Sequence, residues 1–306
     1  MELEYLKSDA KVTKNVGIAE HLHCFRNTVF YNILSYDSAC ITPLHPTNFS
    51  YFSRMLKVSI IGSGNVAHHL SKAFTASDKI ELVQVYARQK EKIDQHVDAK
   101  FVIDDFAEIT DADLYIIAVS DTAIEQVVSQ LTFSDRLVAH TSGAMGLDIV
   151  SSRNRLGAFY PLQTFSKNRE IDMRHVPICI ESSNGSDLKT LQSAAEAISD
   201  HVHQMDSAQR QALHVAAVFA SNFTNHMYTI ASEICSENNI SFDLLKPLIS
   251  ETSGKVLSMS PKDAQTGPAR RNDQVTIERH LEFLDTADRK IIYSMLSESI
   301  AANGKL

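Results

Sequence analysis

The sequence predicts an α/β fold, in which a doubly wound parallel sheet is followed by an all-helical region. Up to about residue 205, short apolar runs rich in β-branched residues alternate with helical patterns. This alternation is typical of parallel strands joined by helical crossovers. From Ser207 to about Glu237 the chain contains no Gly or Pro and is rich in Ala. That stretch predicts one helix of about thirty residues.

Three segments follow from these patterns: a leader over 1–54, a sheet-forming domain over 55–205, and a helical domain over 206–306. In a parallel sheet of this kind, ligands bind in the crevice at the carboxyl ends of the strands. The loops that follow the strands should therefore share one functional edge. The predicted strands are Leu56–Ile61, Ile80–Ala87, Lys100–Ile103, Asp113–Val119, Leu137–His140, Gly157–Gln163, Val176–Ile180 and His201–Met205.

A glycine-containing turn directly follows the first strand and opens a helical pattern. A strand, a tight turn and a helix are the context in which a G-x-G-x-x-A motif predicts dinucleotide binding. Gly62 would allow the sharp turn, and Gly64 would leave room for a pyrophosphate at the positive end of the helix. Ala67 stands at the third glycine's position. The alternative is a glycine turn without a ligand. The expected contact residues are Gly62, Ser63, Gly64, Asn65, Val66 and Ala67.

The end of the second strand indicates which nicotinamide cofactor would bind. No acidic residue follows this strand to hold the ribose hydroxyls of NAD, whereas Arg88 and Lys90 do follow it. The planar guanidinium of Arg88 suits a 2′-phosphate. We therefore expect NADP, with NAD possible; alternatively, Arg88 only caps the sheet edge in water. Further cofactor contacts are expected in the loops after the fourth and fifth strands, at Val119, Ser120, Asp121, Thr141, Ser142 and Gly143.

The long helix is predicted to begin at a capping box formed by Asp206 and Gln209. On a helical wheel one face is apolar, and His214, Ser221 and Asn225 lie nearly opposite, with Asn222 alongside. Such a face suits a polar pocket or an interface, although an ordinary solvated face is an equal alternative. Shorter helices are expected over 241–249, 255–259, 275–284 and 288–302, with a polar loop over 261–273. The apolar face comprises Ala216, Ala220, Phe223, Met227, Ile230 and Ile234.

The leader has no steady periodicity, no apolar signal-peptide core and a balanced charge. We interpret the leader as a poorly ordered arm, or as an extension of the gene model before a natural start at Met55. The cluster of His21, His23 and Cys24 offers too few ligands for a convincing metal site. No metal is expected elsewhere.

The composition excludes some functional classes. The 306-residue chain has a net charge of −8 without a basic stripe, which disfavours a nucleic-acid partner. No stretch has the apolar length of a membrane helix. The four cysteines have no C-x-x-C spacing, and reduced thiols in a cytoplasmic protein are the simplest interpretation.

The order of motifs resembles a bacterial family of uncharacterised two-domain proteins, with a Rossmann-like domain followed by a domain of unknown function. That family is similar in build to pyrroline-5-carboxylate reductase and to 6-phosphogluconate dehydrogenase and its β-hydroxyacid dehydrogenase relatives. The resemblance implies an NAD(P)-binding domain and a helical domain that often forms a homodimer. It supplies no substrate. The motifs are Gly62–Ala67, Ala118–Asp121, His140–Gly143, Phe159–Phe165, His214–Phe219, Asn222–His226, Pro247–Thr252 and Gln265–Arg270.

One departure from these relatives affects the mechanism. The β-hydroxyacid dehydrogenases carry a catalytic Lys shortly after an Asn on the interdomain helix, whereas Asn225 and His226 follow Asn222 here. We therefore expect hydride transfer to a small carbonyl or imine compound, with His214 as the first candidate for proton donor. The alternative for His214 is a hydrogen bond that serves helix packing. Asn222 and Asn225 would bind the substrate oxygen. Substrate contacts are also expected from Gln163 and Thr164, and from Arg270, which could instead lie in a solvated patch or a subunit contact.

Two alternatives remain open. Because no clear acid–base dyad is evident in the sequence, the protein could be a dinucleotide-binding regulator or redox sensor without turnover. A deazaflavin-dependent reductase is a further alternative, since that cofactor's enzymes share the glycine fingerprint. Consumption of reduced cofactor with a panel of carbonyl compounds and imines would separate catalysis from sensing.

Overall fold

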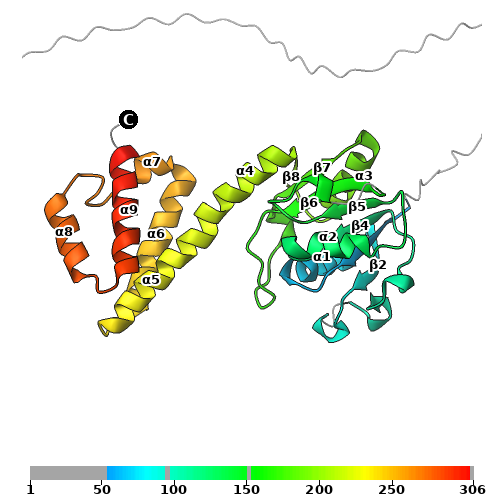
Figure 1. Cartoon of the computed structure of the whole chain (residues 1–306), viewed down its shortest axis with the longest axis horizontal. Coiled ribbons are helices and arrows are strands. Elements are labelled where there is room, and N and C mark those ends of the chain that lie inside the picture. The colour runs from blue at the N-terminus through cyan, green and yellow to red at the C-terminus, as the bar shows by residue number, and fades with distance from the viewer. Residues whose placement is uncertain (1–53, 94–96, 150–152, 304–306) are drawn as a thin grey trace, which may run out of the picture. The chain divides into compact units, whose positions relative to one another are not determined.

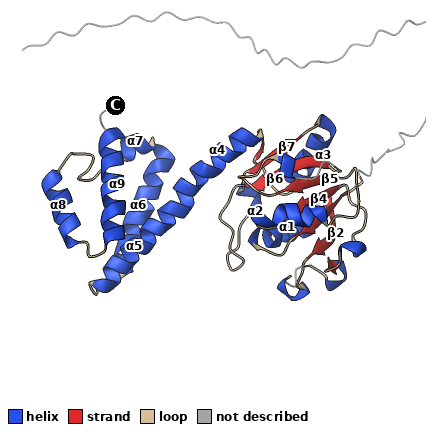
Figure 2. Cartoon of the chain, in the orientation of Figure 1, coloured by secondary structure: helices blue, strands red, loops and turns tan. Residues whose placement is uncertain are grey.

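The computed structural model of the chain describes residues 54–93, 97–149 and 153–303. Within these ranges, strands occur only before Ser207, and the region from there onwards contains helices alone (Figures 1 and 2). The predicted fold class is thereby confirmed. The leader through residue 53, including His21, His23 and Cys24, lies outside the described residues.

A single sheet with strand order β3-β2-β1-β4-β5-β6-β7-β8 forms the first region. The neighbouring strands β1 and β4 are where the strand order reverses, so the loops after them flank the crevice of the sheet. The strands are β1 (Leu56–Ile61), β2 (Ile80–Tyr86), β3 (Val102–Ile103), β4 (Leu114–Ile117), β5 (Leu137–His140), β6 (Arg155–Pro161), β7 (Ile178–Ser182) and β8 (Val202–Gln204).

Neighbouring strands pair in parallel except for β6 and β7, which are antiparallel, so β7 and β8 run opposite to β1–β6. The expectation of an entirely parallel sheet is corrected at this one place. The connection over 162–177 contains only a short 3₁₀ turn, Met173–His175, and no α-helix. A parallel crossover normally requires such a helix, whereas an antiparallel neighbour does not.

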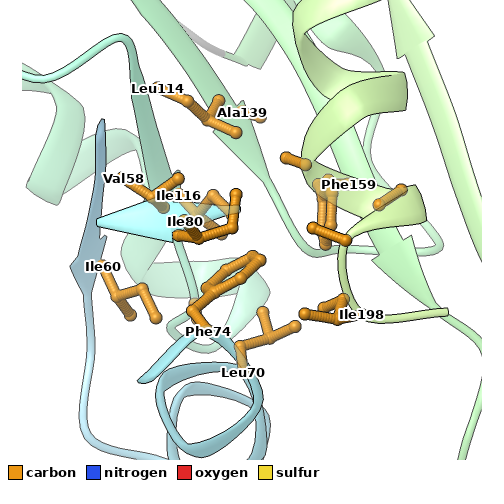
Figure 3. Packing of buried hydrophobic residues seen from close by; sticks show 14 of the residues in the cluster. Val58, Ile60, Leu70, Phe74, Ile80, Leu114, Ile116, Ala139, Phe159 and Ile198 are labelled. Carbon is orange, nitrogen blue, oxygen red and sulfur yellow. The ribbon is translucent and has the colours of Figure 1, made fainter. Parts of the chain in front are cut away.

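Both faces of the sheet are covered, which explains why its strands are almost continuously apolar. Alternate side chains of β1 enter two separate cores, Val58 and Ile60 on one face and Ile61 on the other. On the first face Phe74 lies among strand residues and is fully buried, with Phe159 opposite (Figure 3). The helices of this region are α1 (Asn65–Ala76), α2 (Asp121–Ser129) and α3 (Gly185–Glu196).

The predicted thirty-residue helix is present from Ser207 to Glu237, and the expected capping box between Asp206 and Gln209 is formed. The helix is not uniform, because its middle six residues form a π-helix, Val218–Phe223. We refer to them as the π segment. The α-helices of this region are α4 (Ser207–Ala217), α5 (Thr224–Glu237), α6 (Lys246–Ser258), α7 (Pro261–Ala264), α8 (Gln274–Phe283) and α9 (Ala287–Asn303).

Two expectations about the later helices are corrected. The predicted helices over 241–249 and 255–259 are largely one helix, α6, because Gly254 lies in its interior instead of ending it. A helix-interior Gly costs only about 1 kcal/mol, which packing and neighbouring residues can offset. The loop over 261–273 contains the single turn α7, whose first residue is Pro261 and which Ser260 caps. None of the described helices is long and apolar enough to cross a membrane.

Candidate functional site

A cavity of about 460 Å³ lies at the carboxyl ends of β1, β2 and β4. It therefore occupies the crevice at which an open α/β sheet binds ligands. The cavity is lined by Gly62, Ser63, Gly64, Asn65, Val66, Tyr86, Ala87, Arg88, Phe106, Ala118, Val119, Ser120, Ala123, Gln126, Val127 and Gln130. We call it the first cavity.

The two glycines of the fingerprint differ in what they do. Gly62 has a φ of +142°, and an added Cβ would lie 2.1 Å from the carbonyl oxygen of Ala118. Only glycine fits this turn, where β1 passes close to the residue after β4. Gly64 precedes α1, and an added Cβ would meet nothing within 4 Å. The space beside the helix N-terminus is thus open, as a bound diphosphate requires.

The two basic residues after β2 are in different situations. Lys90 lies 2.8 Å from a carboxylate oxygen of Asp104, and this hydrogen bond is the main reason why the pKa of Lys90 is raised. Arg88 is exposed and lines the first cavity. Arg88 is therefore the cation of this loop that can meet a phosphate in the cavity, whereas Lys90 fastens the loop to the segment after β3.

A second cavity of about 670 Å³ lies where β6 ends beside α4 and the π segment. Val66 lines both cavities, so the two are neighbours across the first turn of α1. Side chains of that helix also hold the loop after β6: the amide of Asn65 donates to the carbonyl of Phe165 at 2.9 Å. The second cavity is lined by Val66, Thr141, Tyr160, Pro161, Leu162, Gln163, Thr164, Phe165, Leu213, His214, Ala216, Ala217, Val218, Ala220, Ser221 and Asn222.

Tyr160 and His214 form a hydrogen-bonded pair in the wall of the second cavity. The phenol oxygen lies 3.1 Å from Nδ1 of the imidazole. Burial raises the pKa of Tyr160, with smaller electrostatic contributions from Cys179 and Asp121. The phenol therefore stays protonated near neutral pH and can donate to Nδ1. In the tautomer in which Tyr160 donates to Nδ1, the N–H of the imidazole is on the other nitrogen, Nε2.

Gly143 allows this pair to approach the loop after β5. An added Cβ there would lie 2.6 Å from Nδ1 of His214 and 2.8 Å from Cζ of Tyr160. Contacts this short do not occur for real side chains, so a larger residue would displace the ring. Gly143 thus acts through close packing against the pair, although it does not line either cavity.

The same loop is held by a buried ion pair. Arg210 of α4 is fully buried, and its guanidinium contacts the carboxylate of Glu181. It also donates to the carbonyl oxygens of Ser142, at 3.2 Å, and Met145. Glu181 in turn accepts hydrogen bonds from the backbone N–H and hydroxyl of Ser207. These contacts join the first turn of α4 to the loop beside the Tyr160–His214 pair.

His140 lies behind this loop and is fully buried. Its Nδ1 accepts a hydrogen bond from the backbone N–H of Ser142 at 3.2 Å. Burial, followed by the charge of Arg210, lowers the pKa of His140 to about 4. A neutral imidazole is therefore part of the native packing at neutral pH.

Most of the expected cofactor residues line the first cavity. Thr141 lines the second cavity instead. Ala67 is buried in the core against which α1 packs. Asp121 begins α2, and the hydroxyl of Ser142 accepts hydrogen bonds from Ala144 and Met145. Ala67, Asp121 and Ser142 are not among the residues that line either cavity.

The expected substrate residues divide in the same way. His214, Asn222, Gln163 and Thr164 line the second cavity together. Asn225, in α5, and Arg270, in the loop between α7 and α8, are exposed and are not among the lining residues of either cavity.

The predicted faces of the long helix need a correction around the π segment. Ala216, Ala220 and Phe223 are exposed instead of buried, while Met227 further along is partly buried. The two alanines also line the second cavity with His214, although they were placed on the opposite face. From Val218 onwards, the wider turn of the π-helix changes the direction of side chains relative to the regular helix that the wheel assumed.

Sequence reasoning missed Tyr160, Arg210 and Glu181. Tyr160 stood inside a motif that the resemblance used, but its role depends on a partner 54 residues away in the chain. Arg210 is the fourth residue of α4, and nothing in the sequence around it indicates that its guanidinium is buried. Of the residues that the structure describes, no group of three or more His, Cys, Asp or Glu side chains could hold a metal ion.

Two family models together match most of the chain. One, described as a Rossmann-like domain, matches residues 45–164, and the other, described as a domain of unknown function (DUF2520), matches residues 176–300. No curated protein matches the sequence.

Solved structures resemble the chain over both regions. A protein of Bacteroides fragilis described as a "putative NADP oxidoreductase" is 38% identical, with a TM-score of 0.74 over 81% of this chain and 98% of that one. An Aspergillus terreus reductive aminase in complex with NADPH is 17% identical, with a TM-score of 0.60 over 82% and 95% of the two chains. A Plasmodium falciparum pyrroline carboxylate reductase with NADP bound is 13% identical, with a TM-score of 0.51 over 81% and 98%.

The similarity to the reductive aminase and to the pyrroline carboxylate reductase shows the fold alone. The Bacteroides fragilis protein is similar enough, over nearly its whole length, to show that it and this chain belong to one family. With the two matching family models in the order in which the chain carries its sheet and its helices, the protein belongs to the family that joins a Rossmann-like domain to a DUF2520 domain.

Proposed function

We propose that the protein is an NADP(H)-dependent oxidoreductase that reduces a small carbonyl or imine compound by hydride transfer. The observation that carries the proposal is the pair of neighbouring cavities, which share Val66. One has the glycine turn and open helix N-terminus that suit a dinucleotide, and the other contains a hydrogen-bonded Tyr160–His214 pair. The relative that is 38% identical is described as a "putative NADP oxidoreductase", which supports the same cofactor.

The residues of the first cavity fit the cofactor. The amides beside Gly62 and Gly64 would hold the diphosphate, and Arg88 would meet the 2′-phosphate with its planar fork of donors. Bound NADPH would supply the hydride. Ser120 and Thr141 would lie near the nicotinamide end, at the edge that adjoins the second cavity.

In the second cavity the chain would position the substrate and deliver a proton. Tyr160 donates to Nδ1 of His214, which leaves Nε2–H as the donor to the substrate oxygen or nitrogen that gains electron density. As this heteroatom takes the Nε2 proton, Nδ1 takes the phenol proton of Tyr160, so that no imidazolate forms, and solvent then reprotonates the phenolate. The amide of Asn222 would hydrogen-bond the same heteroatom. Asn225 and Arg270, which do not line the cavity, are not part of this proposal.

A homodimer is part of the proposal as well. Among the described residues, every exposed large hydrophobic side chain except Met55 lies at or beyond Val215. Leu257 is 89% exposed and Met295 is 65% exposed. Exposed apolar surface of this extent is typical of interaction sites, and a second copy of the helical region would cover it. The two described cysteines, Cys179 and Cys235, are free and buried, consistent with a reducing compartment such as the cytoplasm.

The test follows absorbance of NADPH, and separately of NADH, with a panel of aldehydes, ketones and cyclic imines. We expect consumption of NADPH with at least one compound, and a loss of about 10²-fold or more in kcat for His214→Ala with NADPH affinity retained. Tight binding of NADPH without consumption for any compound would contradict catalysis and favour the alternative, a non-catalytic regulator. No binding of either nucleotide would contradict the proposal as a whole.

A further inference from the structure

The wall of the second cavity has a distinctive chemistry. None of the described side chains that line it belongs to Lys, Arg, Asp or Glu. Apolar groups such as Leu162, Phe165, Leu213 and Val218 make up most of it, and its polar members are neutral amides, hydroxyls, the phenol and the imidazole. A cavity of about 670 Å³ is of the size that holds a small organic molecule.

Of the described charged residues whose contacts or charge reach the wall, Arg210 and Asp121, neither offers a free cation to an anion. Arg210 is fully buried, and its guanidinium is taken up by Glu181 and by carbonyl oxygens of the loop after β5. Asp121 is close enough to contribute to the raised pKa of Tyr160, after burial and Cys179, and its charge would repel an anion. Arg270 does not line the cavity.

We propose that the substrate of this site is a small ketone or imine that carries no carboxylate or phosphate group. The inference rests on the proposed reductase function and narrows its substrate class. An anionic group placed against this wall would give up part of its hydration without gaining an ion pair from the described lining residues, and a partly desolvated, unpaired charge is unfavourable. The apolar wall instead favours the hydrocarbon part of a neutral substrate, while His214 and Asn222 engage its single polar atom.

The experiment compares matched compounds that differ only in a carboxylate. The probes are cyclohexanone against 4-oxocyclohexane-1-carboxylate, and 1-pyrroline against 1-pyrroline-5-carboxylate, each with NADPH and the full chain. We expect the neutral member of a pair to have a kcat/KM higher by about 10²-fold or more, the scale of a desolvated unpaired polar group. Equal values, or preference for the carboxylate, would overturn the proposal.

A binding measurement covers probes that are not turned over. Saturation-transfer NMR with the NADP⁺-loaded protein should show contact with the neutral member and none with its carboxylate. Absence of binding by both neutral probes, with NADP⁺ bound, would overturn the substrate class while leaving the cofactor assignment intact. Failure of NADP⁺ itself to bind would instead contradict the proposed function, so the two outcomes are distinguishable.

A matched pair of variants tests whether the charge of the wall sets the preference. Ala216 and Ala212 are both exposed residues of α4, but only Ala216 lines the second cavity. Ala216→Arg should shift the ratio of kcat/KM values, carboxylate over neutral, upward by about 10-fold, as an added charge-assisted hydrogen bond would. Ala212→Arg should leave the ratio unchanged. An unchanged ratio in Ala216→Arg, or equal shifts in both, would count against the proposal.

Discussion

The phenol oxygen of Tyr160 lies 3.1 Å from Nδ1 of His214, and this hydrogen bond connects the end of β6 to the third turn of α4. It makes a strand residue and a helix residue into one unit in the wall of the second cavity. Because burial raises the pKa of the phenol, its O–H stays protonated near neutral pH, and in the proposed mechanism it donates to Nδ1 and selects the tautomer of the imidazole.

Removing the phenol oxygen tests this arrangement. In Tyr160→Phe the imidazole loses the group that selects its tautomer, and we expect kcat to fall by about 10-fold, the scale of one neutral hydrogen bond. His214→Ala should cost about 10²- to 10⁴-fold, the usual contribution of a general acid. Steady-state kinetics and NADPH titrations would separate the two effects from cofactor binding. A larger loss in Tyr160→Phe than in His214→Ala would mean that Tyr160 itself donates the proton.

Gly143→Ala should displace the imidazole without unfolding the protein. The added Cβ would lie 2.6 Å from Nδ1 of His214, so the ring must move away from its place in the cavity. We expect kcat to fall by at least about 10-fold, since small displacements of catalytic groups are costly. Gly185→Ala is the control, because a Cβ there meets nothing within 4 Å. Equal activities of the two variants would contradict the packing argument.

Arg88→Ala should weaken NADPH binding by roughly 10- to 100-fold, as expected for lost hydrogen bonds to a charged group, and leave NADH almost unaffected. Lys90→Ala is the matched control, because Lys90 lies two residues away and is held at 2.8 Å by Asp104. Its effect on either nucleotide should be small. Calorimetric titration of both cofactors measures the difference. Equal losses of affinity for NADPH and NADH in Arg88→Ala would contradict the proposed contact between Arg88 and the 2′-phosphate.

Removing one partner of the Arg210–Glu181 ion pair should lower the free energy of unfolding more than replacing both partners with apolar residues. Glu181→Leu leaves a fully buried guanidinium without its carboxylate, and we expect a loss of about 3–5 kcal/mol in the free energy of unfolding. The double variant Arg210→Met/Glu181→Leu should recover part of this loss. Urea denaturation gives the values for both.

An exposed ion pair provides the comparison. Arg174 and Asp200 lie 3.2 Å apart with side chains that are 50% and 66% exposed, so Arg174→Ala should cost about 1 kcal/mol or less. If Glu181→Leu were as mild as Arg174→Ala, the buried pair would not hold the loop after β5.

His140 should make the protein less stable in mild acid. Its pKa is lowered from 6.5 to about 4 by burial and by Arg210, so the unfolded chain takes up the proton first as pH falls. The stabilising contribution is present above pH 6.5 and is lost between about pH 6.5 and 4. It amounts to about 3 kcal/mol. Denaturant titrations at pH 7 and pH 4 should show a smaller drop for His140→Asn than for the unaltered protein.

Local patterns were enough to predict the strands and most helices. Leu137–His140 is a short apolar run, and its boundaries are the same in the structure. Gly62 was predicted as a sharp turn from its place between a strand and a helix, and its φ of +142° confirms this. These features depend on neighbours in the chain, and the information for them is local.

The π segment and the antiparallel direction of β7 could not be predicted in this way. Val218–Phe223 has an ordinary helical composition, so no residue in it marks the wider turn. The candidate site residues were predicted from sequence motifs. The roles of Arg88, His214 and Asn222 stay predictions until they are measured.

The sequence by itself determined the α/β sheet, the long capped helix and the glycine turn beside it, because periodicity, capping and backbone conformation act over a few residues. Only the tertiary structure decided that Tyr160 meets His214, that Arg210 is buried against Glu181, and that no charged side chain among the described lining residues faces the second cavity. These contacts join residues that are 29 to 54 positions apart. Their formation depends on how β6, β7 and α4 pack together, which no short stretch of sequence encodes.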